Sequence, residues 1–218
     1  MNECSLHSEI KKVYSLPGDQ FEVKLGNYIV DILRENLIIE VQTKNFSALK
    51  EKLQVLTENH RVRLVHPLAE KKWITHVTKD QGVLNTRKSP KKGKLTDLFR
   101  ELVMIPHMIG KENFSLEVLL INEEEVRCDD GKGSWRRRGV SIKERKLLKV
   151  NDRILFQTKS DYLQILPDDL NEVFTNKELA KLTKISIRTA QQITYCLRKG
   201  GVVRLAGKKG KEHLFQKI

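Results

Sequence analysis

The chain has 218 residues, of which 39% are hydrophobic and 32% charged, a composition that excludes a disordered chain and predicts two or three small globular units. No apolar run approaches the roughly 20 residues that cross a bilayer, and residues 1–14 lack the apolar stretch of a secretory signal. We therefore expect a cytoplasmic, intracellular protein without a membrane partner, associated with the nucleoid if its source is prokaryotic. Three widely spaced cysteines indicate neither a zinc ribbon nor a disulfide framework.

The net charge favours a polyanionic partner. Lys and Arg total 41 against 28 acidic residues, a formal charge of +13. Nucleic acid is the first interpretation. An anionic membrane surface or an acidic protein is the alternative, weakened because no strongly basic helix with a broad apolar face is found.

The N-terminal part, residues 1–84, alternates helix and strand patterns. In chain order the predicted elements are helix 5–14, strands 21–25, 28–33 and 37–42, a helix from 45 to 56, and strands 62–65 and 73–77. The polar residues 34–36 predict a hairpin between the second and third strands. The predicted order is therefore helix, three strands, helix, strand.

The middle part, residues 85–166, is the least regular and is expected to be basic and mixed α+β. Residues 85–94 contain five basic residues and no acid, which predicts an exposed linker. A helix over 95–108 and a strand over 115–122 follow. The segment 127–147 has eight basic and three acidic residues and is predicted to be a loop.

The C-terminal part, residues 167–218, gives the clearest pattern. Thr175 followed by Glu178 predicts a capping box, opening a helix with Leu179 and Leu182 inward. Ser186 is a predicted N-cap for a second helix, whose buried face would be Ala190, Ile193 and Leu197. Gly200 and Gly201 end this helix, and strands over 202–205 and 213–215 would enclose a basic hairpin tip.

Two carboxylates are predicted to face each other in the hairpin. If its connection is residues 34–37, the antiparallel register places Asp31 opposite Glu40, with Cβ atoms about 5 Å apart. Both acids lie in apolar runs, where unpaired ionised groups are costly to bury. Mg²⁺, for which Mn²⁺ can substitute, would neutralise them and take its other ligands from water and phosphate oxygens. The alternative is ion pairs with Lys24, Arg61 or Arg63, or an exposed sheet face.

Residues 5–66 resemble the PD-(D/E)XK, or restriction-endonuclease-like, nuclease superfamily. The resemblance rests on the element order and on Asp31 followed by Glu40-Val41-Gln42. It implies an αβββαβ core that hydrolyses phosphodiester bonds, with Asp31 and Glu40 as metal ligands and Gln42 in the place of the usual lysine. A neutral amide can position water but supplies no charge. Glu9, on the first helix, and Lys44 are further candidates for the active site.

Three basic regions are predicted to contact DNA. The C-terminal part resembles a winged helix-turn-helix, whose second helix would present Arg188, Thr189, Gln192 and Tyr195, with Lys208, Lys209 and Lys211 at the wing tip. The alternative for this unit is protein contact. Trp135 could stack on a base while Arg136, Arg137 and Arg138 hold phosphates, or it could fold onto the core. Lys91 and Lys92 add charge to the linker, whereas His7 and the five other histidines are interpreted as structural.

The sequence therefore predicts an α/β (α+β) chain with a nuclease-like core, a basic middle region and a C-terminal winged helix. The expected protein is a Mg²⁺-dependent endonuclease that acts on duplex DNA. Because one core holds one active site, cleavage of both strands would usually need a homodimer. The alternatives are a non-catalytic DNA-binding or regulatory protein with a degenerate nuclease fold, and an RNA nuclease.

Overall fold

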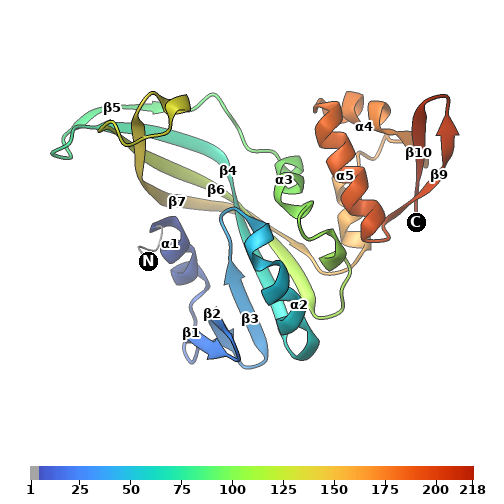
Figure 1. The fold of residues 1–218 in the computed structure, drawn as a ribbon, viewed down its shortest axis with the longest axis horizontal. Helices are drawn as coiled ribbons and strands as arrows, with labels where there is room; N and C mark the ends of the chain where they lie inside the picture. The colour runs from blue at the N-terminus through green and yellow to red at the C-terminus, as the bar shows by residue number, and fades with distance from the viewer. Residues whose placement is uncertain (1–4) are drawn as a thin grey trace.

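The computed structural model of the chain describes residues 5–218 and shows a mixed α+β fold built on a mixed sheet (Figure 1). The N-terminal elements are α1 (Ser5–Tyr14), β1 (Gln20–Leu25), β2 (Tyr28–Arg34), β3 (Leu37–Val41), α2 (Lys50–Asn59) and β4 (Arg61–Val77), with the 3-10 turn η1 (Phe46–Leu49) before α2. The predicted order of helix, three strands, helix and strand is confirmed.

The seven strands of the main sheet come from both the N-terminal and the middle residues. The remaining strands are β5 (Val83–Lys88), β6 (Phe114–Asp129) and β7 (Val140–Phe156), and the spatial order is β1-β2-β3-β4-β6-β7 with β5 beside β4. The β3–β4 and β4–β6 pairs are parallel, and the other pairs are antiparallel. The predicted boundary at residue 84 is wrong for the sheet, because it cuts through β5.

The two faces of the sheet are covered by different helices. Leu6, Ile10 and Tyr14 of α1 are buried against one face. Leu53 and Leu56 of α2 are buried in the larger core on the other face. The candidate hairpin β2–β3 lies between these helices, so side chains from both can reach it (Figure 1).

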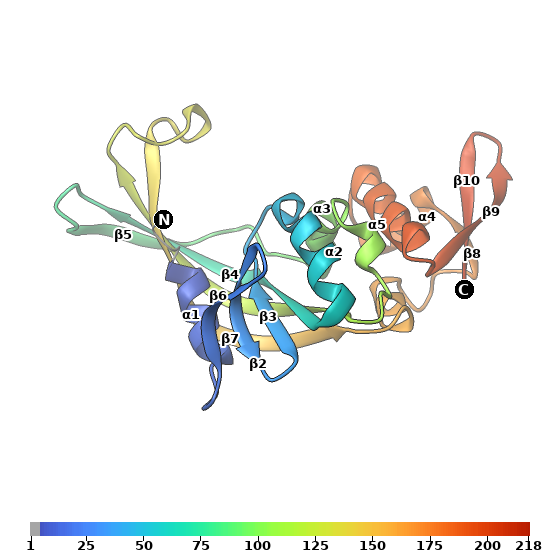
Figure 2. The same ribbon diagram turned by 60° about the horizontal axis from the view of Figure 1, so that its bottom comes forward.

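Long strands leave the core and form an arm. We define the arm as residues 71–88 and 122–146, which comprise the ends of β4, β6 and β7, all of β5, and the 3-10 turn η4 (Trp135–Arg137). Figure 2 shows its two hairpins projecting away from the helices. The predictions of a linker over 85–94, a loop over 127–147 and a separate strand over 73–77 are corrected in part. Residues 85–88 lie in β5, 127–129 in β6, 140–147 in β7 and 73–77 in a continuous β4, whereas 89–94 and 130–139 lie outside the strands.

The end of β6 was missed because its inward side chains are charged. Glu123 and Glu125 are buried and pair with Lys72, Arg127 or Arg145 on the same strand or on neighbouring ones. Alternation of apolar and polar residues therefore fails as a signal, since paired ions fill the positions where a core strand has apolar side chains.

The predicted helix over 95–108 is broken into three short pieces. They are η2 (Leu95–Leu98), α3 (Phe99–Leu102) and η3 (Pro106–Met108). Pro106 has no backbone N–H and disfavours a helical conformation at the residue before it, Ile105, whose φ and ψ are −133° and 41°.

The C-terminal residues form a compact helical and β unit. Its elements are η5 (Ser160–Ile165), β8 (Val173–Thr175), α4 (Asn176–Thr183), α5 (Ile187–Lys199), β9 (Val203–Lys209) and β10 (Glu212–Lys217), with sheet order β8-β10-β9. The capping box of Thr175 and Glu178 and the Ser186 cap are confirmed. Leu182 is 39% exposed, so its predicted inward position is wrong.

The C-terminal unit shares the larger core of the sheet. Ala190, Ile193 and Leu197 of α5 are buried, as predicted, in the same cluster as Phe99 and Leu102 of α3. The unit is therefore anchored to the core at the end of the molecule opposite to the arm (Figure 1). Among residues 5–218, no helix is both long and apolar enough to cross a membrane.

Candidate active site

The hairpin register brings Asp31 and Glu40 together. Arg34 pairs with Leu37 and Ile32 with Ile39, which is the predicted register. Asp31 and Glu40 lie one position beyond the last paired residues, where the Asp31 backbone N–H donates to Glu40 Oε1 at 3.2 Å. The two carboxylates therefore lie where regular β2–β3 pairing stops.

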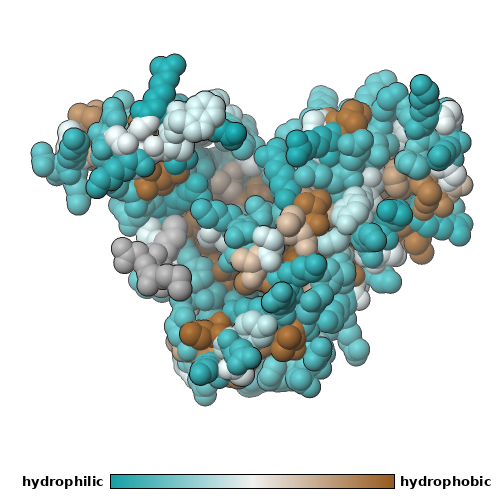
Figure 3. Space-filling model, in the orientation of Figure 1, coloured by the Kyte–Doolittle hydropathy of each residue, from teal (hydrophilic) through white to brown (hydrophobic). Residues whose placement is uncertain are grey.

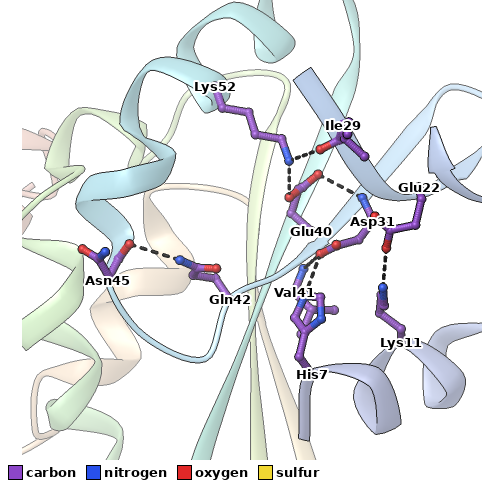
Figure 4. Close-up of polar contacts among 10 residues, drawn as sticks. All are labelled: His7, Lys11, Glu22, Ile29, Asp31, Glu40, Val41, Gln42, Asn45 and Lys52. Atoms are coloured by element: carbon purple, nitrogen blue, oxygen red, sulfur yellow. Dashed lines mark hydrogen bonds and ion pairs between the residues drawn. The ribbon is translucent and has the colours of Figure 1, made fainter. Parts of the chain in front are cut away.

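Asp31 is held by α1 and by the neighbouring strand. Its Oδ2 accepts a hydrogen bond from the Val41 backbone N–H at 2.8 Å and lies 3.1 Å from His7 Nε2 (Figure 4). Burial raises the pKa of Asp31, but the hydrogen bonds from His7 and Val41 outweigh it and hold the pKa below its ordinary value. Asp31 is thus kept ionised.

Glu40 is the more deeply buried acid, and α2 supplies its cation. Its side chain is 4% exposed, and Oε2 lies 2.6 Å from Lys52 Nζ. Burial raises the pKa of Glu40 to about 7, with the Asp31 charge raising it further and Lys52 lowering it. Glu40 therefore changes protonation state near neutral pH. A buried carboxylate perturbed in this way is typical of functional sites, although structural ion pairs also produce such shifts.

Gln42 does not face the two carboxylates. Strand β3 ends at Val41, and Gln42 Nε2 donates instead to the Asn45 carbonyl at 3.1 Å (Figure 4). Its backbone carbonyl accepts a hydrogen bond from His66 Nδ1 at 2.7 Å, which fixes the chain at the end of the strand. The predicted common face of Glu40 and Gln42 is not seen, because strand alternation does not extend to residue 42.

Glu9 and Lys44 also lie away from the pair. Glu9 Oε2 accepts a hydrogen bond from the Leu147 backbone N–H, so its carboxylate joins α1 to β7. Lys44 is exposed in the turn after β3. The structure therefore brings together Asp31 and Glu40 among the five candidates for the active site.

Sequence reasoning missed His7 and Lys52. His7 was interpreted as structural, yet it contacts Asp31; it lies on the same predicted helix as Glu9, two residues earlier. Lys52 lies on a polar position of the helix after β3, and nothing in its local pattern distinguishes it from Lys50. The ion pairs considered with Lys24, Arg61 and Arg63 are replaced by these two helix residues.

The two carboxylates are the ligand type that a hard cation prefers, but they are few in number. Mg²⁺ binds through one or two carboxylates and keeps several waters, so Asp31 and Glu40 are sufficient protein ligands. The contacts of the Asp31 carboxylate with residues 5–218 are made through Oδ2. Within the same described range, no group of three or more His, Cys, Asp or Glu side chains could hold a metal.

The predicted DNA-contacting side chains of α5 and its hairpin are mostly exposed. Arg188 and Tyr195 are exposed and Gln192 is half-buried, whereas Thr189 is buried and cannot read a base edge. The wing-tip lysines are all exposed: Lys208, Lys209 and Lys211. Eleven basic residues against five acidic ones in 167–218 keep this surface positive.

The basic side chains of the arm and linker are exposed as well. Trp135 is 83% exposed, so the interpretation that it folds onto the core is wrong. The Arg136 guanidinium lies 5.6 Å from the centre of its ring. The other predicted contacts in this region are exposed: Arg137, Arg138, Lys91 and Lys92.

Comparison with known proteins places the chain in a family. The model of the domain of unknown function DUF8091 matches residues 4–157, which is most of the chain. The chain belongs to this family. The matched region includes the main sheet, the arm and the Asp31–Glu40 pair, and it ends before the C-terminal unit.

A relative extends the similarity beyond the family domain. An uncharacterized protein of Treponema pallidum (strain Nichols) is 32% identical over 217 residues, which cover 99% of this chain and 85% of the relative. No solved structure matches this DUF8091 chain significantly.

Proposed function

We propose that this chain is a metal-dependent endonuclease that hydrolyses phosphodiester bonds in DNA. The observation that carries the proposal is the juxtaposition of Asp31 and Glu40, with Glu40 buried and its pKa raised to about 7. The αβββαβ order around this pair supports the resemblance to the PD-(D/E)XK superfamily. Fold likeness alone does not assign function, so the paired carboxylates are the stronger argument.

The residues around the pair have distinct roles in this proposal. Asp31 and Glu40 would hold Mg²⁺, which when bound polarises a phosphate and lowers the pKa of water. His7 orients Asp31 through its hydrogen bond to Oδ2. Lys52 places an ammonium beside Glu40 and can donate to a phosphate oxygen, supplying the charge that Gln42 lacks. Gln42 could position water only after its side chain turns away from Asn45.

The C-terminal unit is proposed to bind duplex DNA. Its two helices and basic hairpin follow the order of a winged helix-turn-helix, and Arg188 and Tyr195 lie on the open face of α5. Exposed lysines at the hairpin tip suit phosphate contact, which gives affinity without sequence information. Because one core of this type would hold one active site, cleavage of both strands would require a homodimer or two binding events.

Cleavage assays test the proposal. Purified chain is incubated with duplex, branched and single-stranded DNA, and with RNA, in Mg²⁺ or Mn²⁺. We expect wild-type cleavage of DNA, and a loss of at least about 10³-fold in Asp31→Asn and Glu40→Ala, since metal ligation is worth several kcal/mol. Glu58→Gln, an exposed acid on the same helix as Lys52, is the matched control and should cleave normally.

A non-catalytic DNA-binding protein is the second candidate. It is favoured by the fact that Asp31 and Glu40 already have side-chain partners, the imidazole of His7 and the ammonium of Lys52. If wild type and Glu40→Ala are equally inert while both bind duplex tightly, this second function replaces the first. Cleavage of RNA alone would instead make the protein an RNA nuclease.

A further inference from the structure

The arm encloses a hollow that the proposed catalytic pair does not use. The hollow has a volume of about 1120 Å³ and lies between the arm, the start of α1 and the turn after β3. Figure 3 shows a mostly hydrophilic surface over the arm on the face in view, with smaller hydrophobic patches. We call the hollow the arm groove.

The lining of the arm groove is strongly basic. Seven lysine or arginine side chains line it, against Glu124 and Glu144. Glu124 accepts a hydrogen bond from the Thr75 hydroxyl and Glu144 pairs with Lys146. The basic side chains of the lining therefore outnumber its acidic ones by five, and one of them, Lys146, is paired with Glu144.

Some of the basic side chains are also engaged by acids of the arm itself. Lys143 lies 2.6 Å from Asp130, and Arg145 lies 3.2 Å from Glu125. These pairs hold the strands together and are not available to a ligand. Lys143 and Arg145 therefore have a structural role, and the remaining basic side chains of the lining are the candidates for binding a ligand.

Four exposed basic residues have no such pair. Lys44, Lys79, Lys132 and Arg137 line the groove, and none of them forms an ion pair with an acid among residues 5–218. They come from the turn after β3, the β4–β5 turn and the β6–β7 connection, so they reach the hollow from separate segments. Unpaired cations spaced along a trough suit a chain of phosphates.

An exposed indole lies next to this lining. Trp135 is 83% exposed and lies in the same short segment as Gly133 and Arg137, which line the groove. Sites for single-stranded nucleic acid combine a positive groove with an aromatic side chain on which bases stack. In a duplex the bases are already stacked on each other, and inserting a ring costs a few kcal/mol per step.

The inner end of the groove meets the elements of the catalytic pair. Ser5, at the start of α1, lines the groove two residues before His7, the partner of Asp31. Thr43 and Lys44 line it shortly after Glu40 along the chain. A strand lying in the groove would therefore run toward the two elements that hold the carboxylates.

We propose that the arm groove binds a single-stranded segment of nucleic acid through Lys44, Lys79, Lys132, Arg137 and a base stacked on Trp135. With duplex held by the C-terminal unit at the opposite end, the substrate class becomes a duplex with a single-stranded tail or branch. Binding of the strand is independent of catalysis, and only its subsequent cleavage rests on the proposed function.

Binding measured in a Glu40→Gln background tests this proposal without cleavage of the probe. The probes are a labelled oligothymidine of about 12 nucleotides, within the usual site size, a blunt duplex, and a duplex with the same tail. Lys79→Glu with Lys132→Glu should weaken oligothymidine binding at least about tenfold and lower the salt slope by about 1.4, the value for two phosphate contacts on a single strand. Trp135→Ala should weaken it about tenfold.

The matched control changes charge on the arm outside the groove. Lys71→Glu with Arg87→Glu alters the net charge equally, and neither residue lines the hollow. This control and blunt-duplex binding should change less than about threefold. Three results would overturn the proposal. The two double variants could weaken oligothymidine binding equally, the groove variant could weaken only duplex binding, or the protein could fail to bind oligothymidine. Oligothymidine binding as expected without cleavage by wild type would contradict the endonuclease and leave the groove assignment standing.

Discussion

Buried acids occur both in the arm and in the candidate site, and their surroundings differ. Glu125 of the arm is 2% exposed and is contacted by Arg127, Arg145 and Lys72. Burial raises its pKa, but these three basic partners outweigh that effect and hold the pKa below its ordinary value. Glu40, buried to a similar degree, has Lys52 as its single ion-pair partner within residues 5–218, and its pKa is raised. Glu125 therefore stabilises the arm, whereas ionised Glu40 lowers the stability of the fold. A functional role would explain why a destabilising acid lies at this position.

Glu40→Gln is expected to produce the largest change in stability. The pKa of Glu40 rises from 4.5 to about 7 on folding, so its stabilising contribution is complete below pH 4.5 and is lost as pH rises through 7. At pH 8 the variant should be more stable than wild type by about 3 kcal/mol, the equivalent of that shift. Urea unfolding at pH 5 and pH 8 measures this difference. A variant whose stability depends on pH as strongly as that of wild type would contradict the account of Glu40.

Glu125→Gln should have the opposite sign. Its loss leaves Arg127 and Arg145 without this acid, while Lys72 keeps its ion pair with Glu123. We expect a destabilisation of about 2 kcal/mol at pH 7, below the value for fully buried pairs because the basic partners are partly exposed. The pKa of Glu125 is lowered on folding, so its contribution is present above pH 4.5 and is lost as pH falls through the folded pKa. The difference from wild type in urea unfolding should therefore shrink in acid. Glu58→Gln serves as the exposed control.

Lys52→Met should give the smallest of the three effects. Without its cation, ionised Glu40 is costlier, but the carboxyl can take up a proton instead, so we expect a loss of about 1 kcal/mol at pH 8. At pH 5 Glu40 already carries a proton, and the part of the loss due to the ion pair should vanish. Equal losses at pH 5 and pH 8 in the same unfolding measurement would mean that Lys52 acts only through packing or through its bond to the Ile29 carbonyl.

The elements predicted most accurately are those encoded by neighbouring residues. The Thr175 and Ser186 caps and the buried face of α5 follow from spacings within one helix, and all were confirmed. The pairing of Asp31 with Glu40 was also local, since a short hairpin connection fixes the register.

The features that were missed depend on contacts between distant residues. Lys52 reaches Glu40 only because α2 folds back over the sheet, and His7 reaches Asp31 only because α1 covers the other face. The arm strands carry inward acids such as Glu123, which resemble loop residues until Lys72 is placed beside them. Gln42 was misplaced because β3 ends one residue earlier than its apolar pattern indicated.

Calorimetric titration with Mg²⁺ or Mn²⁺ tests the central claim most directly, because it asks whether the carboxylate pair holds a cation without requiring turnover. The account predicts that wild type binds one ion per chain at pH 8, about tenfold more weakly at pH 6 because Glu40 must lose its proton, and that Glu40→Gln does not bind it. Absence of binding by wild type at pH 8, or equal binding by Glu40→Gln, would contradict it.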